Sequence, residues 1–114
     1  MPYLQIQTNV EIAQENQATL LTHASQTVAQ ALGKSENYVM VALEENVPML
    51  FGGSNDPCAF LLLQSLGLQH QQTAELSEKL CDFIAKQLNI AKDRIYIEFA
   101  SPERIMWGWN GKTF

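Results

Sequence analysis

The chain has 114 residues, of which 46% are hydrophobic, and it carries a formal net charge of −5 at pH 7. This length and apolar content suit one domain with one hydrophobic core, which we expect to span residues 1–114. The acidic balance and the absence of a Lys/Arg run make nucleic acids and anionic membranes poor partners. The apolar run 59–63 is far too short to cross a membrane.

Other classes are disfavoured by the start of the chain and by its cysteines and histidines. Residues 2–10 alternate and lack a basic start, so we expect no secretory signal and a cytoplasmic protein. Cys58 and Cys81 are not in CxxC spacing and are expected to be reduced, structural thiols. The isolated His23 and His70 complete no metal-ligand pattern, so neither a metal nor a cofactor is expected.

The first half of the chain predicts a strand, a helix and a second strand. Residues 2–8 alternate, with Leu4 and Ile6 on one face of a half-buried strand. A helical period begins near Asn16 and stops at Gly33, a residue typical of helix C-termini. The apolar stripe of this helix is Leu21, Ala24, Val28 and Leu32. Residues 38–43 predict the second strand.

The second half predicts the same order of elements. The continuous apolar run 58–63 indicates a fully buried strand. Thr73 is the expected N-cap of a second helix, and residues 93–99 alternate as a strand. The helix stripe is Leu76, Leu80, Phe83 with Ile84, and Leu88. In the last strand Tyr96 and Glu98 point away from the apolar side.

An internal repeat connects the two halves. Residues 32–41 align with 88–97 at a shift of 56 residues (95 − 39), so that Val39 matches Ile95 and Val41 matches Ile97. The chain is therefore β-α-β twice, which predicts an α+β, ferredoxin-like fold with a four-stranded sheet and both helices on one face. The apolar tail 105–109 and the open sheet edges predict self-association.

Met1-Pro2 allows two interpretations. If Met1 stays, the nitrogen of Pro2 is an amide and the proline only starts a strand. If Met1 is removed, Pro2 carries a free secondary amine. An α-amino group titrates near ~8, and enclosure in an apolar pocket lowers its pKa. A neutral nitrogen of this kind is a ready general base.

Several short motifs together resemble the macrophage migration inhibitory factor family of the tautomerase superfamily, and a microbial homologue in particular. The motifs are Met1-Pro2, Asn9, Gly33-Lys34, residues 51–54, residues 57–59, residues 93–97, residues 108–110 and Thr113-Phe114. The resemblance covers essentially the full length. It implies a homotrimer of β-α-β-β-α-β subunits. It also implies keto–enol tautomerisation of phenylpyruvate-like or dopachrome-like carboxylates, in pockets between subunits.

The resemblance also implies roles for individual residues. Pro2 is the general base. Lys34 binds the substrate carboxylate, although a lysine is favoured at a helix C-terminus in any case. Tyr96 donates its hydroxyl in the pocket of a neighbouring subunit. The other matching positions, each equally open to plain packing, are Ser65 and Leu66 at the pocket lining, Tyr38 and Trp109 as aromatic walls, and Phe114 as a closing residue.

The sequence departs from the family pattern at three positions. Leu61 replaces the second thiol of a CxxC motif, so thiol–disulfide activity of that type is not expected. Glu98 replaces an uncharged amide, and its carboxylate would repel an anionic substrate unless Lys34 or another cation offsets it. Trp107 replaces a small aliphatic residue. We expect weak turnover of the usual aromatic substrates. The alternative function is a non-catalytic, cytokine-like trimer that binds another protein.

Overall fold

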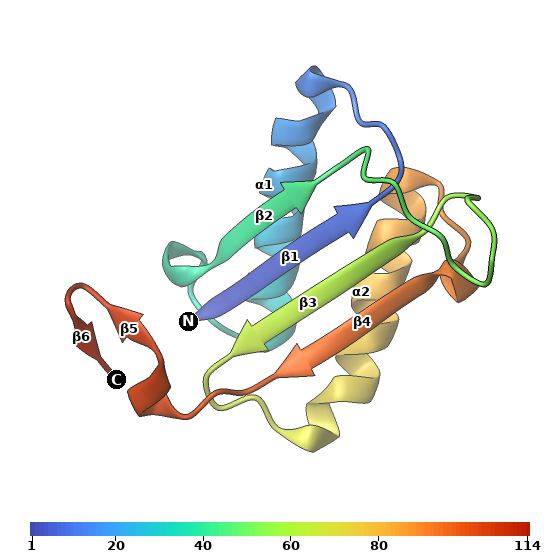
Figure 1. Ribbon diagram of the computed structural model, residues 1–114. Coiled ribbons are helices and arrows are strands. Elements are labelled where there is room, and N and C mark those ends of the chain that lie inside the picture. Colours follow the sequence, from blue (N-terminus) through green and yellow to red (C-terminus); the bar gives the residue numbers. More distant parts are fainter.

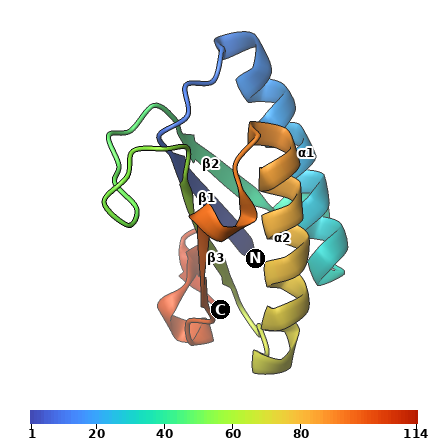
Figure 2. The same cartoon turned by 90° about the vertical axis from the view of Figure 1, so that its right-hand side faces the viewer.

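All of residues 1–114 are described by the computed structural model, in which a four-stranded sheet carries two helices on one face (Figure 1, Figure 2). The main elements are β1 (Pro2–Thr8), α1 (Gln14–Leu32), β2 (Met40–Glu44), β3 (Ala59–Ser65), α2 (Thr73–Leu88) and β4 (Ile95–Ala100). A C-terminal hairpin follows, formed by β5 (Gly108–Trp109) and β6 (Lys112–Thr113). The predicted α+β class and the duplicated β-α-β order are confirmed.

The sheet has the order β2-β1-β3-β4. β1 runs parallel to β2 and antiparallel to β3, and β3 runs parallel to β4. Each β-α-β unit thus places its own two strands side by side, and the two units meet at the β1–β3 pair. The first strand of the chain is therefore an interior strand. Its first residue, Pro2, lies directly opposite Ser65, the last residue of β3.

The core lies between the sheet and the helices. Alternation in β1 and β3 turns every second side chain toward the helices, as with Leu4 and Leu61, which are fully buried. Helix α1 buries Leu20, not the predicted Leu21, together with Ala24 and Val28. Helix α2 buries Leu76, Leu80 and Ile84. No helix of the chain is long and apolar enough to cross a membrane.

Strand β3 corrects one prediction. A fully buried strand was expected from its continuous apolar run, but Phe60 and Leu62 are only half-buried. They lie on the sheet face that neither helix covers, opposite Gln7 and Gln5 of β1. The apolar run of β3 predicted burial on both faces of the sheet, but within one subunit the helices cover only one face.

The starts of the helices and strands differ from the predictions by one or two residues. α1 begins at Gln14 without a side-chain cap, so the sequence held no N-cap signal there. β2 begins at Met40 because residues 36–38 form a 3₁₀ turn. Thr73 does not cap α2, since its hydroxyl donates to the carbonyl of His70. Cys58 lies just before β3, and both cysteines are free thiols, as predicted.

The end of α1 is as predicted. Gly33 has a left-handed backbone with φ of 63° and donates its N–H to the carbonyl of Gln30. The N–H of Lys34 donates to the carbonyl of Ala29 at 3.0 Å. This pair of bonds satisfies carbonyls that the helix leaves open and turns the chain back toward the sheet. Lys34 is thereby carried toward the beginning of β1.

The loop at the other end of the sheet is held by Arg94. Its guanidinium donates to four backbone carbonyls, at distances of 3.0–3.2 Å, and lies 5.1 Å from the centre of the Phe51 ring. The accepting residues are Phe51, Ser54, Asp56 and Pro57. The planar fork of arginine suits several acceptors, whereas lysine offers a single point charge. Arg94 therefore fixes the conformation of residues 51–57.

We predict that Arg94→Ala lowers the free energy of unfolding by about 1–3 kcal/mol, since hydrogen bonds from a charged donor are lost. Urea denaturation followed by circular dichroism measures this. Arg94→Lys should recover only a minor part of the loss. An Arg94→Lys variant as stable as the wild type would show that the fork geometry is unimportant.

Candidate functional site

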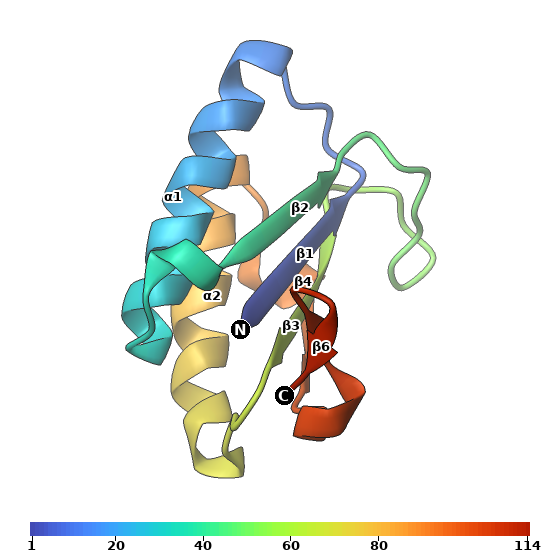
Figure 3. The ribbon, with the colours of Figure 1, turned by 90° about the vertical axis from the view of Figure 1, so that its left-hand side faces the viewer.

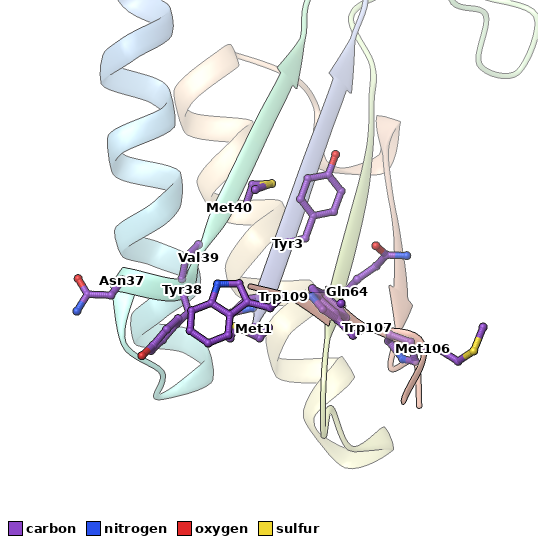
Figure 4. Close-up of a pocket in the computed structure, with 13 residues that line it drawn as sticks. Met1, Tyr3, Asn37, Tyr38, Val39, Met40, Gln64, Met106, Trp107 and Trp109 are labelled. Carbon is purple, nitrogen blue, oxygen red and sulfur yellow. The ribbon is translucent and has the colours of Figure 1, made fainter. Parts of the chain in front are cut away.

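A pocket of about 560 Å³ lies at the start of β1, between β2 and the C-terminal segment (Figure 4). Residues 1–3 form its floor. Residues 37–40 form one wall, and Gln64, Pro102 and residues 106–109 form the other. Figure 3 shows the C-terminal hairpin lying beside the beginning of β1, which is why segments from both ends of the chain meet here.

The N-terminal amine lies at this pocket in an environment that disfavours its charge. The pKa of the Met1 amino group is lowered from its ordinary value of 8.0. The main cause is burial, which removes water from the ammonium form, and the second cause is the positive charge of Lys34. A nitrogen in this position is neutral over a wider pH range than a free α-amine.

Lys34 is positioned by a backbone contact. Its ammonium Nζ donates to the carbonyl of Leu66 at 3.1 Å. An ammonium has three donors, so two remain for another acceptor. Leu66 itself is buried, and only its carbonyl takes part in this contact. The predicted residues Lys34 and Leu66 are therefore in direct contact, and the field of Lys34 reaches the N-terminus.

Ser65, the last residue of β3, is the cross-strand neighbour of the first residue of β1. It is fully buried, directly opposite Pro2, and its hydroxyl has no hydrogen-bond partner. The other fully buried polar side chain in the strands, Thr8, donates to the carbonyl of Cys58 at 2.7 Å and accepts from the N–H of Val10 at 3.1 Å. Ser65 is thus the exception among the buried polar side chains.

Aromatic side chains form much of the pocket wall. The rings of Tyr38 and Trp109 meet edge to face with their centroids 6.0 Å apart, and Trp107 is half-buried beside them. Phe114 stacks on Trp109 with a centroid distance of 6.2 Å, behind the wall. Figure 4 shows Tyr38 and Trp109 side by side across the pocket from Met106. These predicted residues come together around an opening that suits a flat, apolar group.

Tyr96 and Glu98 lie elsewhere. They are exposed on the uncovered face of β4, with Tyr96 opposite Phe60 of β3, whereas Pro2 lies opposite Ser65 at the other end of β3. The Tyr96 ring is 60% exposed and packs on Phe51 at a centroid distance of 4.6 Å. One subunit therefore does not bring Tyr96 and Pro2 together.

Some pocket residues were not predicted. Asn37, Met40, Gln64 and Met106 line the pocket without being singled out from the sequence. Gln64 could have been found, since it precedes Ser65 on an alternating strand. The hairpin that carries Trp109 could also have been found, because Asn110-Gly111 is a strong hairpin signal and both residues have positive φ. No group of three or more His, Cys, Asp or Glu side chains forms a metal-binding arrangement.

Comparison with known proteins gives a consistent result. The family model "Macrophage migration inhibitory factor (MIF)" matches residues 1–114. A macrophage migration inhibitory factor homologue of Brugia malayi is 42% identical, with 100% of this chain and 99% of the relative aligned, and the Mus musculus protein is 36% identical over the same shares. A solved homologue from Prochlorococcus marinus is 40% identical, with a TM-score of 0.92 over 98% of each chain. The Trichinella spiralis factor is 34% identical, with a TM-score of 0.92 over 98% of this chain and 99% of that one.

We predict that Lys34→Gln raises the pKa of the Met1 amino group in protein that retains Met1, because one cause of its depression is removed. The pKa should remain below 8.0, because burial is the larger cause. The pH dependence of α-amine acylation, read by peptide mass spectrometry, measures it. Lys79→Gln is the control, since Lys79 pairs with Glu75 on α2 at 2.9 Å. Equal pKa values in the wild type and Lys34→Gln would contradict the electrostatic interpretation.

Proposed function

Because the chain belongs to the macrophage migration inhibitory factor family and has its fold, we propose that it is a keto–enol tautomerase with Pro2 as the general base. The proposal requires removal of Met1, which converts the amide nitrogen of Pro2 into a secondary amine. The observation that carries it is the position of the chain start, in a pocket where burial and Lys34 lower the pKa of the terminal amine. We propose residues 1–114 as one domain of this kind.

The proposed reaction is a proton transfer without redox chemistry. The neutral nitrogen of Pro2 removes a proton from the carbon next to the substrate carbonyl, and the C–H electrons form a C=C bond while the C=O π electrons move to oxygen. The protonated Pro2 nitrogen then gives a proton to that oxygen, which yields the enol and restores the neutral amine. The reverse direction returns the proton to carbon. One group serves both halves best when its pKa is near the working pH. The lowered pKa of the Met1 amino group, at the same end of the chain, supports that role for a Pro2 amine.

The proposed substrate is a small aromatic 2-oxo acid or a similar carboxylate. Lys34 has two donors free after its bond to Leu66, and a carboxylate accepts them well. The Tyr38 and Trp109 rings offer an edge-to-face wall for an aromatic group.

Completion of the site is proposed to need a neighbouring subunit. Tyr96 is exposed and held on Phe51 at the far end of the sheet, so it is free to meet another copy of the chain. β2 and β4 are edge strands, which favour pairing with other chains. We propose a homotrimer in which each Pro2 works with Tyr96 of its neighbour.

Two residues are proposed to reduce turnover of simple aromatic substrates. Trp107 is half-buried in the pocket wall and takes up room that a smaller side chain would leave open. Glu98 lies two residues from Tyr96 on the same face of β4, so a shared site would receive its negative charge as well. This charge would oppose binding of the substrate carboxylate at Lys34.

We predict that the mature protein lacks Met1 and that Pro2→Gly lowers kcat/KM for phenylpyruvate tautomerisation by about 10²–10⁴-fold, the usual value of a general base. Intact mass spectrometry and an enol assay on the same sample measure both. Pro48→Ala is the control, since Pro48 is exposed and outside the pocket. Full activity of Pro2→Gly, or activity of protein that keeps Met1, would contradict the proposal. An inactive wild type that lacks Met1 would favour the protein-binding alternative.

We further predict that Pro2→Gly and Tyr96→Phe are each strongly impaired, and that mixed trimers recover activity. Each mixed trimer contains a site with an intact Pro2 from one subunit and an intact Tyr96 from its neighbour. Unfolding and refolding the two variants together, followed by the enol assay, measures the recovery. Refolding each variant alone is the control. If the mixture is no more active than the separate variants, Tyr96 does not act across the interface.

A further inference from the structure

The hydroxyl of Ser65 is buried and makes no hydrogen bond while Met1 is attached to the chain. It is 0% exposed and has no hydrogen-bond partner. Leaving a buried hydroxyl unpaired costs about 1–3 kcal/mol, so such a group needs an explanation. Direct contact with a substrate is a poor explanation, because Ser65 is covered and does not line the pocket.

The missing partner is in the right place if Met1 is absent. Pro2 is the direct antiparallel partner of Ser65, and both side chains lie on the helix side of the sheet. Side chains opposite each other in such a pair have Cβ atoms about 4.5–5.5 Å apart. While Met1 is attached, the nitrogen of Pro2 carries no hydrogen and offers nothing to the hydroxyl. Cleavage gives it one N–H when neutral and two when protonated.

We propose that Ser65 is a positioning residue whose hydroxyl accepts a hydrogen bond from the Pro2 nitrogen once Met1 has been removed. This inference rests on the proposed function, which makes that nitrogen the base. In the neutral amine the single N–H is held by Ser65 on the buried side, so the lone pair points to the pocket. In the protonated amine one N–H stays on Ser65 and the other is aimed at the substrate.

A hydrogen bond from Pro2 to Ser65 would change the pKa of the Pro2 amine in a definite direction. The Ser65 oxygen stabilises the protonated amine, so it raises the pKa of Pro2. Burial and the positive charge of Lys34 act in the opposite direction on the Met1 amino group at this end of the chain, and we expect the same of a Pro2 amine. Loss of the hydroxyl should therefore lower the pKa of Pro2 and move the acid limb of the rate profile to lower pH.

The first test is a comparison that needs no activity. Ser65→Ala and the wild type are prepared with Met1 removed, and again with Met1 retained by inhibiting the methionine aminopeptidase during expression. Urea denaturation should show that Ser65→Ala lowers the unfolding midpoint of the processed protein only. With Met1 retained, removal of an unpaired hydroxyl should leave the midpoint unchanged or raise it. The same shift in both forms would overturn the proposal.

The second test uses a matched pair of variants. Thr and Val have nearly the same shape, and only Thr keeps the hydroxyl. In processed protein, Ser65→Val should lower the Pro2 pKa measured by ¹⁵N NMR, and it should lower kcat by about 10–100-fold with little change in KM, because the base loses its orientation. Ser65→Thr should restore both. Equal values for Thr and Val would overturn the proposal. An inactive wild type would contradict the tautomerase function, while the urea and NMR results would still decide the role of Ser65.

Discussion

Pairing of β1 on both of its sides is the constraint on which the site depends. The strand starts at the second residue of the chain, yet it lies between β2 and β3 in the interior of the sheet. An N-terminus is normally free and mobile. Here Pro2 is paired with β3 and Tyr3 is paired with both neighbours, and the pocket forms around these residues. The start of the chain is therefore held in place by the sheet.

The turn that follows α1 places Lys34, the charged residue that acts on the N-terminal amine. Because α1 ends in a left-handed glycine, the chain turns sharply, and Lys34 reaches the carbonyl of Leu66 just beyond β3. The backbone therefore positions Lys34 twice, through the Gly33 turn before it and through the Leu66 carbonyl that its ammonium contacts. Lys34 lies close enough to lower the pKa of the terminal amine and has donors left over. One turn therefore contributes both to the fold and to the electrostatics of the pocket.

The sequence was sufficient for the order of elements and for the end of α1, because alternation, the 3.6-residue period and Gly33 are local signals. It was insufficient for the extent of burial. Phe60 and Leu62 have the composition of core residues, but their exposure depends on what covers the open face of the sheet. Local sequence also does not encode which segments meet, so Asn37 and Met106 could not be assigned to one pocket in advance.

The uncovered face of the sheet combines apolar and polar groups. Phe60, Leu62 and the exposed Tyr96 lie near Gln5 and Gln7, whose side-chain amides donate to the carboxylate of Glu44. A purely apolar face would favour association with many partners. A mixed face favours only a partner that also pairs its polar groups. Phe51 contacts both the Arg94 guanidinium and the Tyr96 ring, so the tyrosine packs against a residue that Arg94 holds in place.

The convergence of the two ends of the chain has a practical consequence for protein engineering. Residues 1–3 line the pocket, and the C-terminal Phe114 stacks on Trp109 in its wall. A fusion at the N-terminus would therefore add groups directly at the pocket, and one at the C-terminus would start from a residue packed on its wall. Labels belong on the outward surface of the helices, for example at the exposed Glu78 of α2, where both ends of the chain are left as they are.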